Sequence, residues 1–213
     1  MGFEQGAAYS IAYGTSYHAL KQGANLKPGE TVLVLGAAGG VGNTAVEIAK
    51  AMGGTVIAAA STDEKLAFAK EAGADETINY YDMPLKETVK EMTGGKGVDV
   101  VYDPVGGDLA EQALRATGWH GRYLVVGFAS GDIPTFPANL TLLKEASIVG
   151  VWWGPWAAKH TEEMLVNMQE LETMVAEGKL RPRVTKTFSL DEFAGAFRLI
   201  TERRVLGKVV LTV

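Results

Sequence analysis

The chain has 213 residues, of which 47% are hydrophobic, and a formal net charge of -5. This is enough apolar material to bury a sizeable core, the size of one domain or of one and a half domains. The excess of acidic residues and the lack of basic runs argue against nucleic acid and anionic membranes as partners. The absence of cysteine excludes disulfides and a thiolate nucleophile and removes the commonest zinc ligand. His18, His120 and His160 lack metal-ligand spacing, and no signal peptide or long apolar stretch is found, so we expect a cytoplasmic protein without a metal site.

Strand and helix patterns alternate along most of the chain. A helical pattern over Met1–Asn25, interrupted at Gly14, precedes a turn at Lys27–Glu30. Short apolar runs then predict six strands, at Thr31–Leu35, Thr55–Ala60, Glu76–Tyr80, Val98–Val105, Gly121–Phe128 and Ala146–Trp153. Helices are expected between them, after Val41, from a capping box at Ser61–Glu64, from Pro84 and near Leu109–Ala116, with a loop around Pro134 and Pro137 before the sixth strand. This order predicts an α/β fold, a Rossmann-like doubly wound parallel sheet of about six strands.

The pattern changes after Pro155. One long amphipathic helix is expected to run to about Glu177, and a second capping box at Ser189–Glu192 opens a shorter helix. Two further strands, Val184–Phe188 and Gly207–Val213, follow a sheet that is already complete, so we expect their partners elsewhere. The predicted division is a helical lead-in at 1–30, a dinucleotide-binding domain at 31–155 and a C-terminal part at 156–213.

The turn after Leu35 is the strongest functional signal. Gly36, Gly39, Gly40 and Gly42 lie between a predicted strand and a predicted helix, as in dinucleotide-binding sites, although Ala37 departs from G-x-G-x-x-G. The helix N-terminus is electropositive, and glycine lets a pyrophosphate approach the backbone. The alternative is a glycine-rich turn without a ligand.

The end of the second strand indicates which cofactor is bound. Residues 58–61 contain no carboxylate of the kind that binds the ribose 2′-hydroxyl of NAD, whereas Ser61 and Lys65 suit a 2′-phosphate. We therefore expect NADPH rather than NADH. Two alternatives stay open: Ser61 is only a helix cap and Lys65 a solvated charge, or Asp63 turns inward and reverses the preference.

Several motifs together resemble the zinc-independent quinone oxidoreductases, the zeta-crystallin-like family of the medium-chain dehydrogenase/reductase superfamily. They are, in chain order, GTSYHAL (14–20), AAGGVG (37–42), INY (78–80), VVYDPVGG (100–107) and LGKVVL (206–211). The resemblance covers essentially the whole chain and implies NADPH-dependent hydride transfer to a quinone or another activated alkene. The cofactor carries the reactive hydride, and the protein mainly orients it.

The resemblance also implies roles for individual residues. Gly39, Gly40 and Val41 would receive the pyrophosphate, with Ala38 beside them, and Thr15 and Val41 would pack by the nicotinamide. The 2′-phosphate would be surrounded by Ser61, Lys65 and Tyr80, with Arg203 as a fourth member. The nicotinamide end would be lined by Val105, Gly127, Phe128, Val151 and Trp153, although ordinary packing is the alternative for the tryptophans. No catalytic residue is assigned.

The chain departs from that family at its start. Members begin with a separate, mostly β catalytic domain, and we expect that domain to be absent here and the two late strands to be left over from it. A fragment of this kind would bind NADPH but reduce quinone poorly or not at all. Family members commonly form dimers by pairing the sixth strand, so a homodimer is expected. Alternatives are a fragment of an enoyl or acryloyl thioester reductase, or a non-catalytic nucleotide-binding protein.

Overall fold

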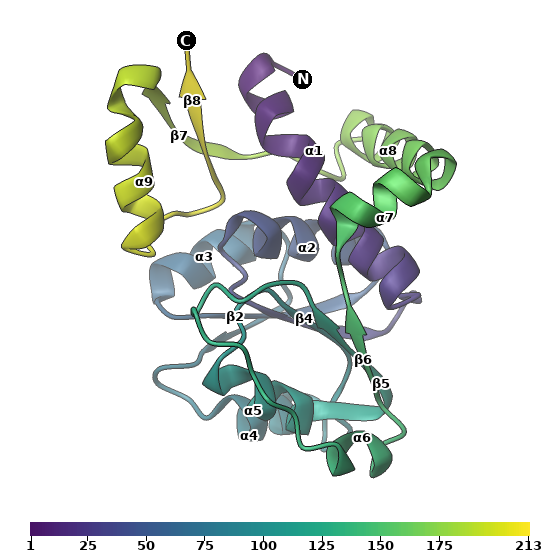
Figure 1. The fold of residues 1–213 in the computed structure, drawn as a ribbon. Helices are drawn as coiled ribbons and strands as arrows, with labels where there is room; N and C mark the ends of the chain where they lie inside the picture. Colours follow the sequence, from purple (N-terminus) through teal and green to yellow (C-terminus); the bar gives the residue numbers. More distant parts are fainter.

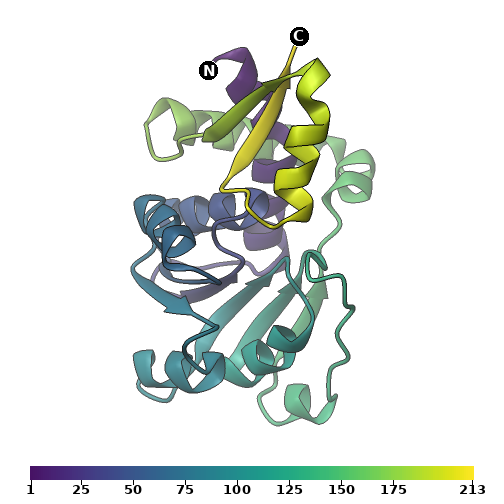
Figure 2. The same cartoon turned by 90° about the vertical axis from the view of Figure 1, so that its left-hand side faces the viewer.

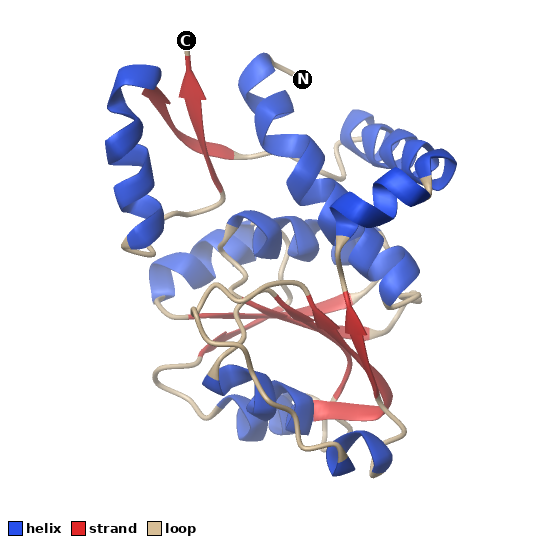
Figure 3. Cartoon of the chain, in the orientation of Figure 1, coloured by secondary structure: helices blue, strands red, loops and turns tan.

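The computed structural model describes residues Met1–Val213 and contains two parallel sheets (Figure 1, Figure 3). The larger has six strands in the order β3-β2-β1-β4-β5-β6, which confirms the predicted Rossmann-like sheet. Its strands are β1 (Thr31–Leu35), β2 (Thr55–Ala60), β3 (Glu76–Asn79), β4 (Val98–Asp103), β5 (Thr117–Val125) and β6 (Ser147–Gly150).

Helices cover both faces of this sheet because alternate side chains of its strands point to opposite sides. On β1, Val32 and Val34 belong to one buried cluster, and Leu33 and Leu35 to the other. The first cluster is shared with α1 (Phe3–His18), α2 (Gly40–Ala51), α3 (Asp63–Glu71) and α8 (Thr161–Ala176). The second is shared with α4 (Leu85–Met92) and α5 (Asp108–Ala116), on the opposite side in Figure 1.

The strand order places a crevice at the carboxyl ends of the central strands. Strand β1 pairs in parallel with β2 on one side, Val32 opposite Val56, and with β4 on the other, Val32 opposite Val100. The chain direction across the sheet reverses between β1 and β4, and in open α/β sheets ligands bind outside the carboxyl ends of the strands at such a point.

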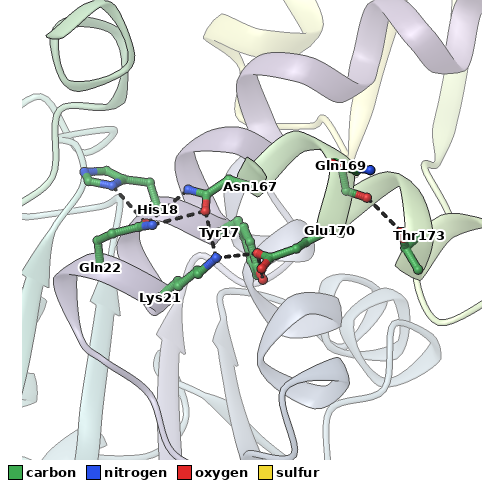
Figure 4. A network of polar contacts seen from close by, with 8 residues as sticks. All are labelled: Tyr17, His18, Lys21, Gln22, Asn167, Gln169, Glu170 and Thr173. Carbon is green, nitrogen blue, oxygen red and sulfur yellow. Dashed lines mark hydrogen bonds and ion pairs between the residues drawn. The ribbon is translucent and has the colours of Figure 1, made fainter. Parts of the chain in front are cut away.

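A polar network attaches α8 to the end of α1 and to the π-helix η1 (Ala19–Gly23) that continues it (Figure 4). Lys21 forms an ion pair with Glu170, which also accepts a hydrogen bond from the Tyr17 hydroxyl. The buried Asn167 exchanges amide hydrogen bonds with Gln22. These polar contacts add to the apolar packing of α8, whose Leu171 is fully buried in the first cluster.

The C-terminal elements lie outside the large sheet. Strands β7 (Val184–Ser189) and β8 (Lys208–Thr212) pair only with each other, and the 3-10 turn η2 (Leu190–Glu192) and helix α9 (Phe193–Thr201) connect them. Figure 2 shows this unit standing above the α2 and α3 layer, with both chain termini at the same end.

Several predicted strand ends are wrong. Strand β4 stops at Asp103, not Val105, because the Asp103 carboxylate accepts the backbone N–H groups of Val105 and Gly106 and turns the chain. Strand β3 stops at Asn79, one residue early, because the Asn79 side chain bonds the N–H of Tyr81.

Strands β5 and β6 also differ from the prediction. Strand β5 begins directly after α5, at Thr117, and ends at Val125, so Gly127 and Phe128 belong to the loop that follows. Strand β6 is shorter than predicted because it pairs with β5 alone, and its ladder ends where the N–H of Val151 reaches the carbonyl of Val125.

The helices bring four more corrections. Helix α3 is capped by Thr62, whose hydroxyl accepts the N–H of Lys65, so the predicted capping box at Ser61 is wrong. Helix α1 runs through Gly14 unbroken. The predicted single helix after Pro155 is two, α7 (Trp153–Lys159) and α8, because His160 has non-helical dihedrals. The short helix α6 (Asn139–Leu142) was not expected.

Candidate functional site

A groove of about 600 Å³ lies at the carboxyl ends of β1, β2 and β4, beneath the β7–β8 unit. Its lining residues come from the segment 36–130, which belongs to the six-stranded sheet and its loops, and from the C-terminal segment 200–209. None of these residues is acidic. Nine of the sequence-predicted site residues line it: Ala38, Gly39, Gly40, Val41, Ser61, Lys65, Tyr80, Val105 and Arg203.

The glycine turn forms the floor of the groove. Gly36 has a φ of 56°, which favours glycine, and Gly39 precedes α2 in an extended conformation. No side chain caps α2, so the N–H groups of Gly40 and Val41 have no partner in the protein. Unpaired N–H groups at the positive end of a helix dipole form an anion-binding site.

Buried hydroxyl groups hold the start of α2 in place. The Ser16 hydroxyl of α1 lies 3.0 Å from the carbonyl oxygen of Val41 and 2.8 Å from the hydroxyl groups of Thr44 and Tyr102. Helix α1, helix α2 and strand β4 are thereby joined below the groove. These hydrogen bonds hold the first turn of α2 in position.

Lys208 is the charged groove residue to which the sequence reasoning gave no role. Its aliphatic chain lies against Gly40, where an added Cβ would sit 3.1 Å from the Lys208 Cδ atom. Burial lowers the pKa of Lys208, and its ammonium group has no ion-pair or hydrogen-bond partner. A partly desolvated cation beside a helix N-terminus favours the binding of an anion between them. Its only sequence signal is its place in the LGKVVL run, which carried the family resemblance but no assigned role.

A second positive region lies at the β2 and β3 end of the groove. The Lys65 ammonium group donates to the Ser61 hydroxyl over 3.0 Å. Burial raises the pKa of Tyr80, while its hydrogen bond with Ser61 and the charge of Arg203 act in the opposite direction. The Arg203 guanidinium donates to the carbonyl of Ser130 over 2.9 Å, across the mouth of the groove. Two cations and two hydroxyl groups thus converge, a set suited to a phosphate group.

Five predicted residues do not line the groove. Thr15, Gly127, Phe128, Val151 and Trp153 lie instead near the ends of β5 and β6 and on α1. The Trp153 indole covers Gly14, where an added Cβ would come within 2.6 Å of the ring, and Phe128 is 42% exposed.

No group of three or more His, Cys, Asp or Glu side chains is placed to hold a metal ion. None of the helices combines the length and hydropathy that crossing a membrane requires.

Comparison with protein families gives a match over residues 40–170 to the family described as zinc-binding dehydrogenase. A quinone oxidoreductase-like protein 2 homolog from Nematostella vectensis is 42% identical over 213 residues, which are 99% of this chain and 58% of that protein. The chain therefore spans less than two thirds of this relative's length.

Two solved structures illustrate the similarity in three dimensions. The Escherichia coli quinone oxidoreductase, solved in complex with NADPH, superimposes with a TM-score of 0.89 at 32% identity, covering 100% of this chain and 66% of that one. The CurK enoyl reductase gives a TM-score of 0.87 at 27% identity, covering 100% of this chain and 64% of that one. Both similarities extend beyond the glycine turn to the whole chain.

Proposed function

The chain belongs to the zinc-binding dehydrogenase family, among the quinone oxidoreductase-like proteins of the medium-chain dehydrogenase/reductase superfamily, and on this premise we propose that it is the NADPH-binding part of an oxidoreductase. The proposed reaction of the whole protein is hydride transfer to a quinone or another activated alkene. The NADPH complex of the E. coli relative supports the choice of cofactor.

The observation that carries the proposal is the pair of positive regions in one groove. Lys208 and the N-terminus of α2 form one, and Lys65 and Arg203 form the other. A dinucleotide phosphate has a diphosphate bridge and, in NADPH, a separate 2′-phosphate, and the groove offers a place for each. An added Cβ at Gly40 would fill the space between α2 and Lys208. Glycine leaves this space open for the diphosphate, so the residues present fit the cofactor.

Bound NADPH would supply a hydride from its nicotinamide ring. The protein would hold the phosphates at the two positive regions and direct the nicotinamide ring toward the ends of β4 and β5. Val105, which lines the groove, would pack against the ring there. The buried Asp103 keeps the turn at Val105 fixed through two backbone hydrogen bonds. Thr15, Gly127, Phe128, Val151 and Trp153 remain proposed contacts of the nicotinamide end.

Residues 156–213 are proposed to belong partly to a substrate-covering domain, since β7 and β8 lie outside the six-stranded sheet. We propose that quinone reduction by the whole protein needs this domain together with the cofactor groove. Vigorous steady-state quinone reduction by the chain alone would contradict this part of the proposal.

A homodimer through β6 is also proposed. Strand β6 pairs only with β5, which leaves its other edge open, and Ile148 on it is 37% exposed. Open strand edges favour pairing with a second chain. A monomeric mass by light scattering at micromolar concentration would count against the dimer.

An enoyl thioester reductase is the second candidate, favoured by the similarity to the CurK enoyl reductase over the full chain. It shares the cofactor groove and differs in the electron acceptor. Assaying the whole protein with a quinone and with an enoyl thioester would separate the two.

Calorimetry with NADPH and NADH tests the cofactor assignment. Lys65→Ala removes a charge-assisted phosphate contact, so the Kd for NADPH should rise roughly 10-fold to 150-fold, with little change for NADH. Lys70→Ala removes the same charge from the same helix, outside the groove, and should change neither. Equal affinity of the unmodified chain for NADH and NADPH would overturn the assignment.

A further inference from the structure

Asp63 is the carboxylate nearest in sequence to the end of β2, where NAD-binding sites place an acid for the ribose 2′-hydroxyl. It follows Ala60 by three residues and begins α3, yet it does not line the groove. Its Oδ1 atom instead accepts a hydrogen bond from the side-chain amide of Asn79 over 3.3 Å. The acid that would favour NADH is thus present but directed elsewhere.

Asn79 is well placed to hold this carboxylate. It is the last residue of β3 and pairs with Ala60, so the strand register brings it beside the loop that enters α3. Its Oδ1 atom accepts the N–H of Tyr81 over 3.2 Å. Because that bond needs the amide oxygen, the NH₂ group is the part left to face Asp63.

The same side chain therefore has two separable contacts. One fixes the backbone at Tyr81, which together with Tyr80 lines the groove. The other holds Asp63 away from the region where Lys65 and Arg203 converge. Loss of the first contact would loosen a wall that both cofactors touch, whereas loss of the second would act on the 2′ substituent alone.

We propose that Asn79 is a positioning residue for cofactor selectivity: by binding Asp63 it keeps the 2′-phosphate region free of negative charge. The inference rests on the proposed NADPH-binding function. A released Asp63 carboxylate would repel the 2′-phosphate of NADPH and accept a hydrogen bond from the 2′-hydroxyl of NADH. The preference for NADPH is then set partly by a residue that does not itself line the groove.

Asn79→Ser isolates the second contact. A serine hydroxyl can still accept the N–H two residues ahead, at Tyr81, but it is too short to reach Asp63. We expect the ratio of the NADH and NADPH dissociation constants to fall about 5-fold, and Asp63→Asn in the same chain to restore it. Asn79→Ala removes both contacts and should in addition weaken both cofactors.

The measurement is calorimetric titration of the full chain with NADPH and with NADH, with thermal unfolding of each variant as the check on folding. The single variants Asp63→Asn and Asp82→Asn serve as controls because each removes one negative charge. Each should leave the ratio of the two dissociation constants near its original value. An unchanged ratio in Asn79→Ser, or a changed ratio that Asp63→Asn does not restore, would overturn the inference. Failure of the unmodified chain to bind NADPH would overturn the proposed function and this inference with it.

Discussion

Gly42→Ala should destabilise the fold although alanine is the better helix former. Gly42 lies in the first turn of α2, directly against the glycine turn, and an ideal Cβ there would sit 2.2 Å from the carbonyl oxygen of Gly36 and 3.0 Å from the Cα of Ala37. Both neighbours are backbone, so no flexible side chain can move aside. The helix would have to shift from the strand by about 1 Å to restore ordinary contact.

Overpacking of this kind costs about 3 kcal/mol or somewhat more, and the gain in helix propensity returns about 1 kcal/mol. We therefore expect a net loss of about 2 kcal/mol, which for a chain of this size lowers Tm by roughly 4–8 °C. Urea unfolding followed by circular dichroism measures the loss directly.

The matched control is Gly6→Ala. Gly6 also lies within a helix, α1, but an added Cβ there meets nothing within 4 Å. This variant should be more stable than the original chain by about 0.5–1 kcal/mol. An unfolding midpoint of Gly42→Ala at or above that of the unmodified chain would refute the close approach of helix and strand.

Two further outcomes concern Lys208 and His18. Lys208→Met should weaken NADPH and NADH by the same factor, roughly 10-fold or more in calorimetry, because the two share the diphosphate; a loss confined to NADPH would contradict the placement of Lys208. Burial lowers the pKa of His18 in the folded chain below its ordinary value of about 6.5. As the pH drops from 7.5 toward 5.5, the imidazole of the unfolded chain is therefore protonated at a higher pH than that of the folded chain, and the stability of the fold falls. Urea unfolding of His18→Gln should show a flatter dependence in that window, and a curve parallel to the original would argue against the buried neutral imidazole.

The sheet was predictable because its signals are local. Strands β1 and β2 have the predicted bounds, Thr31–Leu35 and Thr55–Ala60, since each is a short apolar run bounded by turn or cap residues. The break between α7 and α8 at His160 has no such local signal, because no glycine or proline lies at it. The chain bends there, and both helices pack on α1. Tertiary packing overrides local preference at this point.

The site was predictable only in part, for a related reason. The glycine turn and Lys65 belong to one continuous stretch, so their proximity could be argued from the order of strand, turn and helix. Lys208 lies far along the chain from Gly40 and reaches it only through the path of β8. The capping error arose because Ser61 and Thr62 are both good N-caps, and only the extended backbone at Thr62 decides between them.

A crystal structure of the chain grown with NADPH would show whether the groove at the carboxyl ends of β1 and β4 holds a dinucleotide phosphate. We expect a diphosphate within hydrogen-bonding distance of the backbone N–H groups of Gly40 and Val41 and of Lys208, and a 2′-phosphate between Lys65 and Arg203. Density for NADPH elsewhere, or an empty groove at saturating cofactor, would contradict this expectation.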